Sequence, residues 1–177
     1  MSNYIEIKYP KDSFKKYQKD ILCQNRLELF FKMAFISLEN YTFAIADTEN
    51  FVSILSVENI NPYYLLKIVA EIIEKMIEAE NRYLYIGEYK IDARYIMCST
   101  IDKSVMMFYV PYVYRSKKEI VDDIKRVILD IARNIPVKYR TSGVLKRALD
   151  FIELSGNDLR LISCKFNRMY FNEKKRV

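Results

Sequence analysis

The sequence of 177 residues predicts an α+β fold in a single domain, in which a small antiparallel sheet precedes a helical part. Apolar residues that alternate with polar ones, or that form short uninterrupted runs, are concentrated in residues 1–58, as is typical of strands. In residues 59–173 most apolar residues recur every three or four positions, as on amphipathic helices, and two short apolar runs interrupt this pattern. Strands followed by helices with one embedded β-hairpin are typical of an α+β domain.

The first 25 residues indicate one strand and one short helix. Tyr4–Tyr9 alternates apolar and polar residues, so it is expected to form a half-buried strand, which Pro10 ends. Ser13–Asn25 carries apolar residues at helical spacing, and either Asp12 or Ser13 can cap the N-terminus of this helix.

Three apolar runs complete the sheet-rich part. Phe30–Leu38 and Tyr41–Ala46 flank the polar pair Glu39 and Asn40, which predicts the two strands of a hairpin. Phe51–Val57 is shorter, and its pattern fits either an edge strand or one turn of helix.

The clearest helix is predicted over Asn61–Ala79. Asn61 can cap it, and Pro62 suits the first helical position because the N–H that proline lacks is unpaired there in any case. Leu65, Val69 and further apolar residues cover so much of its circumference that the helix is expected to be largely buried.

Three more helices are predicted over Ser116–Ile135, over Val144–Leu154, and from a cap at Asn157 or Asp158 to about Phe171. Ser116 and Glu119 can form a capping box, in which each side chain binds the backbone N–H of the other residue. Gly156 is well placed to end the helix over Val144–Leu154.

The stretch Tyr83–Tyr112 separates the first two strong helices and is the centre of the predicted fold. It contains two short apolar strands, Tyr95–Cys98 and Val105–Val110, joined by a polar turn at Ser99–Ser104. Gly87, the only glycine in the first 140 residues, leads into this unit. Helix–loop–strand–turn–strand units of this kind carry the catalytic residues in many folds.

The net charge of +6 arises from 29 basic and 23 acidic residues, a modest excess. Two mild basic concentrations occur, one at Lys8, Lys11, Lys15, Lys16 and Lys19 and the other at Arg160, Lys165, Arg168 and Lys174–Arg176. Solubility is the favoured role for both, and binding to nucleic acid is the alternative.

The residue types exclude several kinds of chemistry. The chain has no histidine, which removes the usual general base, the usual catalytic triad and most zinc sites. Its three cysteines are widely spaced and are expected to be free, buried thiols. The N-terminus lacks the apolar core of a signal peptide, and no apolar run approaches the ~20 residues of a membrane-spanning helix. We therefore expect a cytoplasmic protein that does not insert into a membrane.

The order of the elements resembles a reduced protein-kinase fold. A kinase needs a glycine-rich loop, a strand lysine, a catalytic aspartate, a metal-binding asparagine and an Asp-Phe-Gly motif. In this sequence Ala46 stands where the strand lysine belongs, Lys90 replaces the aspartate and Tyr95 the asparagine. Tyr109–Pro111 falls where Asp-Phe-Gly belongs, so a kinase relative with these residues is not expected to hold Mg²⁺ or to activate a hydroxyl.

Short motifs between Tyr4 and Leu154 form a second, closer pattern. They are Tyr17-Gln18, Ile21-Leu22, Asn25, Phe30–Leu38, Phe43–Asp47, Ser53–Leu55, Asp92–Ile96 and Phe108–Pro111. This pattern resembles a domain of unknown function that usually precedes a forkhead-associated domain in Gram-positive bacterial proteins. It departs from the family at Ala93, where proline is usual. The resemblance implies an intracellular, non-catalytic, kinase-like adaptor domain, of a kind that occurs near secretion or pilus machinery.

The aromatic residues that end the central stretch are the candidate contact residues. Tyr109, Tyr112 and Tyr114 lie around Pro111 on an extended segment, an arrangement that favours a docking groove for a protein partner. Core packing of Tyr109 with ordinary exposure of the others is the open alternative. The function expected is a non-catalytic, pseudokinase-like interaction or adaptor domain linked to secretion, pilus or signalling machinery. No catalytic residue, cofactor or metal site is expected, and a small basic nucleic-acid-binding protein is the alternative function.

Overall fold

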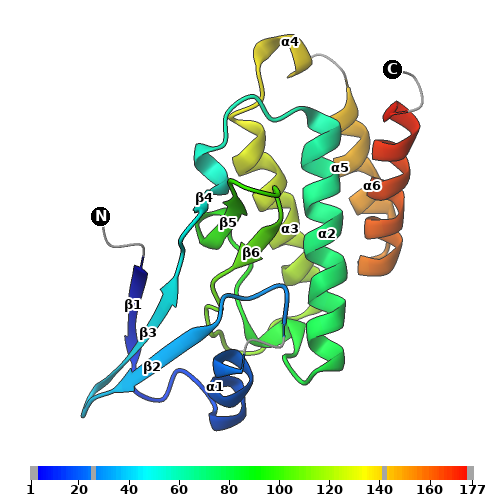
Figure 1. Cartoon of the computed structure of the whole chain (residues 1–177). Coiled ribbons are helices and arrows are strands. Elements are labelled where there is room, and N and C mark those ends of the chain that lie inside the picture. Colours follow the sequence, from blue (N-terminus) through cyan, green and yellow to red (C-terminus); the bar gives the residue numbers. More distant parts are fainter. Residues whose placement is uncertain (1–3, 25–26, 141–142, 175–177) are drawn as a thin grey trace.

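Residues 4–24, 27–140 and 143–174 are described by the computed structural model, in which they form six α-helices and two small antiparallel sheets (Figure 1). The predicted α+β class, with strands first and helices afterwards, is confirmed. Asn25, which carries part of the family resemblance, and the basic residues Lys175 and Arg176 lie outside the described residues.

The first sheet contains β1 (Tyr4–Pro10), β2 (Met33–Ser37) and β3 (Tyr41–Asp47) in the order β1-β3-β2. The predicted hairpin is confirmed as β2–β3, and β1 pairs with β3 along its whole length. Alternate residues of β3 are buried, because one face of the sheet is covered and the other is open. Figure 1 shows this sheet extending away from the long helices, toward the lower left.

The first helix, α1 (Lys16–Cys23), packs against β2 and begins three residues later than predicted. The backbone N–H of Ser13 donates to the carbonyl of Pro10 at 3.1 Å, so Ser13 closes a turn and does not cap the helix. Lys15 occupies the cap position, and its backbone N–H donates to Oε1 of Gln18 at 2.9 Å.

The second sheet contains β4 (Phe51–Ser53), β5 (Ile96–Ser99) and β6 (Val105–Met107) in the order β4-β5-β6. The embedded hairpin β5–β6 is confirmed, although its second strand ends three residues earlier than predicted. Both alternatives for Phe51–Val57 occur, because β4 is an edge strand and one turn of 3-10 helix, η1 (Ile54–Ser56), follows it directly.

The two sheets are connected by the short segment Leu29–Phe31. The backbone N–H of Met107 donates to the carbonyl of Leu29 at 2.7 Å, and that of Phe31 donates to the carbonyl of Met107 at 3.1 Å. Phe30 and Met107 thereby form a parallel bridge. This segment runs beside the outer strand of the second sheet before it enters β2.

The two strongest predicted helices are confirmed with their caps. In α2 (Pro62–Asn81), Oδ1 of Asn61 accepts the N–H groups of Tyr63 and Tyr64. In α3 (Lys117–Ala132), Ser116 and Glu119 form the predicted capping box. The helix α3 ends three residues before the predicted end, because its last turn tightens into hydrogen bonds between residues three apart.

The remaining helices are α4 (Val137–Arg140), α5 (Val144–Leu154) and α6 (Leu159–Lys174). The predicted bounds of α5 agree with the structure, and Gly156 follows it with φ at +61°, a conformation that glycine adopts without strain. Oδ1 of Asp158 accepts the N–H of Leu161 at 3.1 Å and so caps α6, as predicted. The single turn of α4 after Pro136 was not predicted.

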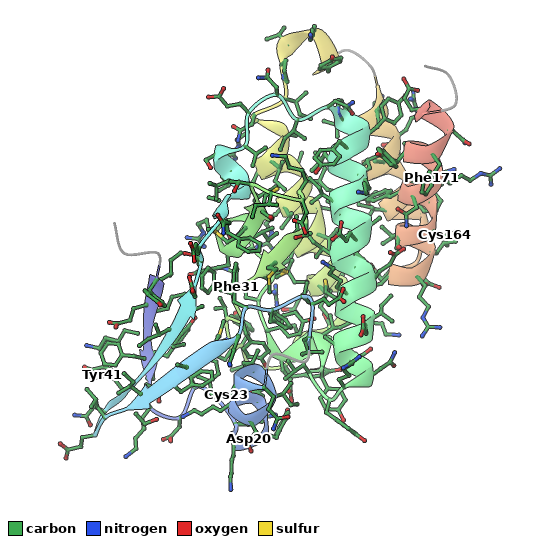
Figure 2. The ribbon with its side chains drawn as sticks, in the orientation of Figure 1. Asp20, Cys23, Phe31, Tyr41, Cys164 and Phe171 are labelled. Carbon is green, nitrogen blue, oxygen red and sulfur yellow. The ribbon has the colours of Figure 1, made fainter. Side chains whose placement is uncertain are left out.

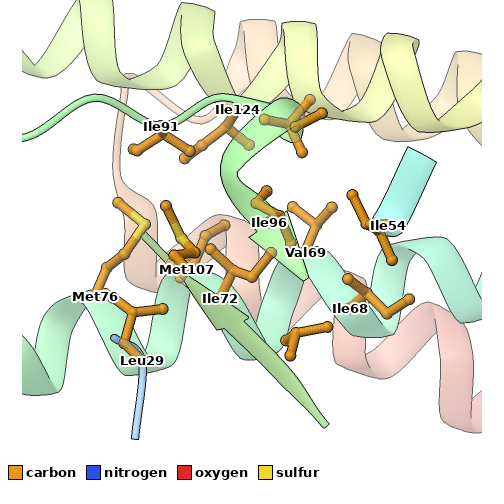
Figure 3. Packing of buried hydrophobic residues seen from close by; sticks show 14 of the residues in the cluster. Leu29, Ile54, Ile68, Val69, Ile72, Met76, Ile91, Ile96, Met107 and Ile124 are labelled. Atoms are coloured by element: carbon orange, nitrogen blue, oxygen red, sulfur yellow. The ribbon is translucent and has the colours of Figure 1, made fainter. Parts of the chain in front are cut away.

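The helix α2 is the centre of the hydrophobic core. Its buried side chains contact the second sheet and α3 on one side, and the helix packs along α6 on the other (Figures 1 and 3). Figure 3 shows Ile72 of α2 close to Met107, and Val69 close to Ile96. The same buried cluster includes Phe14 from the sheet-rich part and Phe166 from α6, so both predicted parts of the chain share one core.

The three cysteines are free, but only Cys98 is buried. The expectation of buried thiols is therefore wrong for Cys23 on α1 and Cys164 on α6, which are exposed and lie in well-separated parts of the molecule (Figure 2). Within the described ranges, no helix combines the length and the apolar character needed to cross a membrane.

Candidate functional site

Lys90, which occupies one of the kinase-like positions, belongs to an ion-pair cluster around Asp92. Asp92 accepts Nη2 of Arg94 at 2.6 Å and Nζ of Lys90 at 3.1 Å. The hydrogen bonds from Arg94 hold the pKa of the Asp92 carboxyl well below its usual range, against the opposing effect of burial. A carboxylate in this state stays ionised at neutral pH and cannot act there as a general acid.

Two other kinase-like positions hold a methyl group and a phenol, in place of the lysine and the asparagine of a kinase. Ala46 is buried in β3, and Tyr95 is half-buried at the end of η3 (Ala93–Tyr95). Among the described residues, no group of three or more cysteine, aspartate and glutamate side chains is placed to hold a metal ion.

The candidate contact residues lie on a segment that pairs with the loop around Gly87. The N–H of Lys90 donates to the carbonyl of Val110, and the N–H of Tyr112 donates to the carbonyl of Glu88, both at 2.9 Å. The N–H of Arg115 donates to the carbonyl of Gly87, also at 2.9 Å. These three hydrogen bonds hold residues 110–115 in place although they belong to no named strand.

Tyr109 is part of the hydrophobic core, so the prediction that it contacts a partner is wrong. Its side chain is fully buried, and its ring centroid lies 5.2 Å from that of Phe30 and 5.3 Å from that of Tyr89. Burial raises the pKa of its hydroxyl, whose Oη donates to the carbonyl of Glu88 at 3.4 Å. The alternative of core packing therefore holds for this residue.

Tyr112, Val113 and Tyr114 form an exposed run that we call the aromatic edge. Their relative exposures are 54%, 83% and 78%, whereas Pro111 just before them is half-buried. The positions of Tyr112 and Tyr114 are compatible with the predicted contact role, which itself stays a prediction. Val113 was not predicted as a contact residue, because only the aromatic residues and the proline stand out in this segment of the sequence.

Gly87 fixes the position of Tyr114 at this edge. A Cβ atom on Gly87 would lie 2.9 Å from Cε2 of Tyr114 and 3.0 Å from the carbonyl oxygen of Arg115. Only glycine therefore allows the tyrosine ring to lie against the backbone at this position. Although Tyr114 is largely exposed, one side of its ring has a defined place.

A buried ion pair lies next to the aromatic edge and contacts the ring of Tyr112. Nη1 of Arg115 donates to Asp123 of α3, and their side chains are 8% and 1% exposed. The guanidinium carbon lies 5.0 Å from the ring centroid of Tyr112, within the range of a cation–π contact. The hydrogen bond to Asp123 raises the pKa of Arg115, so this side chain keeps its charge. The pair was not predicted from the sequence, although Asp123 lies three residues after Ile120 and four before Val127, at the spacing of the buried stripe of α3.

Glu88 connects the same loop to α1. Its carboxylate accepts Nζ of Lys15 at 2.5 Å, Nε2 of Gln18 at 3.0 Å and the hydroxyl of Tyr17. Burial acts to raise the pKa of Glu88, but these three donors together lower it below the ordinary value of 4.5.

A pocket of about 500 Å³ opens beside the aromatic edge. Its walls come from the end of α2, the loop around Gly87, the start of α3 and the turn between α5 and α6. The lining residues are Ile77, Glu80, Asn81, Tyr85, Ile86, Gly87, Tyr114, Arg115, Lys117, Ile120 and Gly156–Arg160. Aromatic, cationic and acidic side chains therefore meet in one concave site.

These features define an α+β domain with two small sheets and a polar pocket next to exposed aromatic residues. The chain matches no protein-family model, and no curated protein matches it in sequence. Its fold is similar to that of a Staphylococcus aureus EssB cytoplasmic fragment, with a TM-score of 0.54 and 13% sequence identity. The similarity covers 93% of this chain and 99% of the fragment, so it concerns the whole fold.

Proposed function

We propose that this chain is a non-catalytic, pseudokinase-like module that binds another protein through the aromatic edge. The observation that carries the proposal is the edge itself, where three consecutive apolar side chains are exposed on a backbone held by hydrogen bonds to Gly87 and Glu88. Exposed tyrosines in a fixed position lose little conformational freedom on binding, and tyrosine is enriched at the centres of protein interfaces.

The residues at the kinase-like positions support the non-catalytic part. A kinase needs carboxylate and amide groups for its metal ions, and here Lys90 and Tyr95 occupy the corresponding positions. Lys90 is paired with Asp92 at 3.1 Å. We expect no rise in melting temperature when ATP and Mg²⁺ are added, and a clear ATP-dependent rise in a thermal-shift assay would contradict this part.

The place of action proposed is the cytoplasm, next to secretion, pilus or signalling machinery. The similarity of fold to an EssB fragment described as cytoplasmic supports the location, and the resemblance to the forkhead-linked family supports the association with such machinery.

The test of the contact role is crosslinking in the native cell. A photoreactive amino acid at position 113 is expected to capture a protein partner, and Tyr114→Ala in the same chain is expected to reduce the yield strongly. Tyr4→Ala is the matched control, because Tyr4 is also an exposed tyrosine but lies on β1, outside the edge. If both tyrosine variants change the yield equally, the edge is not the binding surface.

Nucleic-acid binding remains the alternative, and the structure engages three lysines of the first basic concentration in contacts within the chain. Lys15 is paired with Glu88, Nζ of Lys8 lies 3.6 Å from the ring centroid of Tyr41, and Nζ of Lys19 donates to Ser37. Retention on DNA or RNA that falls steeply with added salt would favour this alternative over the proposed protein contact.

A further inference from the structure

The strand β1 is an edge of the first sheet. The sheet has the order β1-β3-β2, so within the described ranges β1 pairs with β3 alone, and Figure 1 shows it at the outer margin of the sheet. Its residues alternate between exposed and half-buried from end to end, as in a regular strand without a bulge. An exposed edge strand of this kind can pair with a further strand.

The backbone groups that are free on this edge follow from the pairing with β3. The N–H of Lys11 donates to the carbonyl of Asn40 at 3.2 Å, one position beyond the last pair of the β1–β3 ladder. Hydrogen-bonded pairs alternate with non-bonded pairs along an antiparallel ladder, so Ile5, Ile7 and Tyr9 form the hydrogen bonds to β3. The residues whose N–H and C=O groups point away from β3 are therefore Tyr4, Glu6 and Lys8.

Two of these residues carry opposite charges. Glu6 and Lys8 are both exposed, and the ion pairs found in the described part of the chain do not include Glu6. Nζ of Lys8 lies 3.6 Å from the ring centroid of Tyr41 on the same face of the sheet. A lysine on an edge discourages pairing with a strand that has no acidic residue opposite it. This edge therefore favours a strand with a carboxylate at the matching position.

A second copy of β1 has a carboxylate at that position. When two β1 strands pair antiparallel around a two-fold axis at Ile7, Glu6 of each copy lies opposite Lys8 of the other. Both residues have free backbone groups, so the same register also allows hydrogen bonds between the two strands. The registers shifted by two residues place Glu6 opposite Glu6 or Lys8 opposite Lys8, and like charges directly opposite each other are destabilising.

The covered face of the sheet is compatible with the same register. Ile5, Ile7 and Tyr9 are half-buried and pack against the core. Around the two-fold axis, Ile7 lies beside Ile7 of the second copy and Ile5 lies beside Tyr9, so apolar side chains meet on this face. Pro10 ends the pairing, because it has no N–H and its carbonyl accepts the N–H of Ser13 at 3.1 Å.

We propose that the chain forms a symmetric dimer by antiparallel pairing of β1 with β1 of a second copy, which joins the two first sheets into one. The two-fold axis closes the contact at two chains. A contact made mainly by one strand is expected to bury less than the ~1,200 Å² of a stable interface, so we expect a dissociation constant of about 10–500 µM. Its residues do not belong to the aromatic edge, so the dimer is independent of the proposed function.

The test is sedimentation-velocity centrifugation of the full chain at increasing concentration. The wild type is expected to form dimers that weaken with added salt, because the two charge pairs are exposed. Glu6→Lys and Lys8→Glu are each expected to weaken the dimer at least about tenfold, since each change places like charges opposite each other in both pairs. An equimolar mixture of these two variants is expected to dimerise again, because each lysine of one chain then lies opposite a glutamate of the other.

Two further variants control for charge and register. Lys32→Glu makes the same change in charge at an exposed position directly before β2, the other edge strand, and it is expected to leave the dimer unchanged. Glu6→Gln is expected to weaken the dimer about twofold to tenfold in the proposed register. If Glu6 lay opposite Glu6, the same change would strengthen the dimer.

Hydrogen exchange measured by NMR locates the contact on the strand. The amides of Glu6 and Lys8 point away from β3 and are expected to exchange more slowly as the protein concentration rises. The amides of Ile5 and Ile7 are bonded to β3 in a single chain, so their exchange is expected to depend much less on concentration.

Any of four results would overturn the proposal. They are a wild type that stays monomeric at about 1 mM, a mixture of the two charge variants that stays monomeric, a dimer that Lys32→Glu weakens as much as Lys8→Glu does, and exchange at Glu6 and Lys8 that does not depend on concentration. A stronger dimer of Glu6→Gln would overturn the register. Crosslinking through position 113 tests the aromatic edge separately, so the failure of one proposal leaves the other standing.

Discussion

Tyr109 and Tyr114 lie five residues apart on one segment and have opposite environments. Tyr109 points into the core, while Tyr112 and Tyr114 point outward. Strand alternation does not explain the difference, because Phe108 beside Tyr109 is buried as well and Val113 between the two outer tyrosines is 83% exposed. The sequence pattern therefore could not separate the core tyrosine from the exposed pair.

Gly87→Ala tests whether the close approach of Tyr114 depends on glycine. The added Cβ meets both a ring and a backbone oxygen, so we expect a loss of about 1–3 kcal/mol in the free energy of unfolding, measured by urea denaturation. Gly87→Ala is expected to cost less free energy of unfolding in a chain that already carries Tyr114→Ala than in the wild type, because the clash with the ring is gone. Wild-type stability of the single variant would contradict this account.

Arg115→Met tests the buried ion pair. Of the ion-pair partners that Asp123 has among the described residues, this change leaves only Arg126, whose Nη1 lies 3.3 Å from Oδ1 of Asp123. A loss of about 3–5 kcal/mol in the free energy of unfolding is therefore expected in urea denaturation. Replacing both partners, as in Arg115→Met, Asp123→Leu, is expected to cost less than the single change. Arg126→Met is the control, since that side chain is 66% exposed and should contribute less than about 1 kcal/mol.

Helices were easier to predict than strands, because their ends are marked by local chemistry. Asn61 with Pro62, and Ser116 with Glu119, give backbone N–H groups a partner close by in the sequence, and both helices begin where these caps indicate. The start of α1 was wrong because Ser13, a good cap, is used in a turn with Pro10. Strand ends depend on distant partners, so β6 stops where its pairing with β5 stops.

The candidate site was less predictable than the fold. Tyr112 and Tyr114 were found from their residue type, but the pocket beside them combines residues from four separate parts of the chain. The ion pair of Arg115 and Asp123, and the approach of Tyr114 to Gly87, depend on tertiary packing between segments that carry no shared motif.

Glu88→Gln tests the attachment of α1. Glu88 accepts three donors from α1 and its cap residue Lys15, so we expect a loss of about 1–3 kcal/mol in the free energy of unfolding at neutral pH. The pKa of Glu88 is lowered in the folded state, so its contribution is fully present above the ordinary value of 4.5 and is lost as the pH falls through the lowered value.

The measurement for Glu88→Gln is urea denaturation as a function of pH. The difference from wild type should shrink on acidification. Glu153→Gln is the control, because Glu153 pairs with Lys125 on the surface, is 69% exposed, and should contribute little to stability at any pH. A difference for Glu88→Gln that does not change with pH would contradict the expected ionisation.

At the scale of the whole molecule, the two sheets differ in how well they are covered. All four residues of β5 are buried, whereas no residue of β1 is fully buried. Parts of a protein with few buried apolar contacts open more readily than the core. We expect the amides of β5 to exchange with deuterium much more slowly than those of β1, as measured by NMR.

The central strand β3 distinguishes two causes of fast exchange in β1. If β3 also exchanges faster than β5, the first sheet opens as a unit, and if β3 is as slow as β5, only its edge strand frays. Equal protection of β1 and β5 would show that the open face of the first sheet does not weaken it.

The parallel bridge between Phe30 and Met107 has a consequence for synthesis on the ribosome. The sheet of β1, β3 and β2 needs only segments up to Asp47 and can form early, but Leu29, Phe30 and Phe31 bury against residues made much later. Until translation has passed Met107, these three apolar side chains have no complete partner surface in the nascent chain. We expect this segment to be a preferred chaperone-binding site on ribosome-bound chains that stop before Met107, and to be protected from proteases once the full chain has been released.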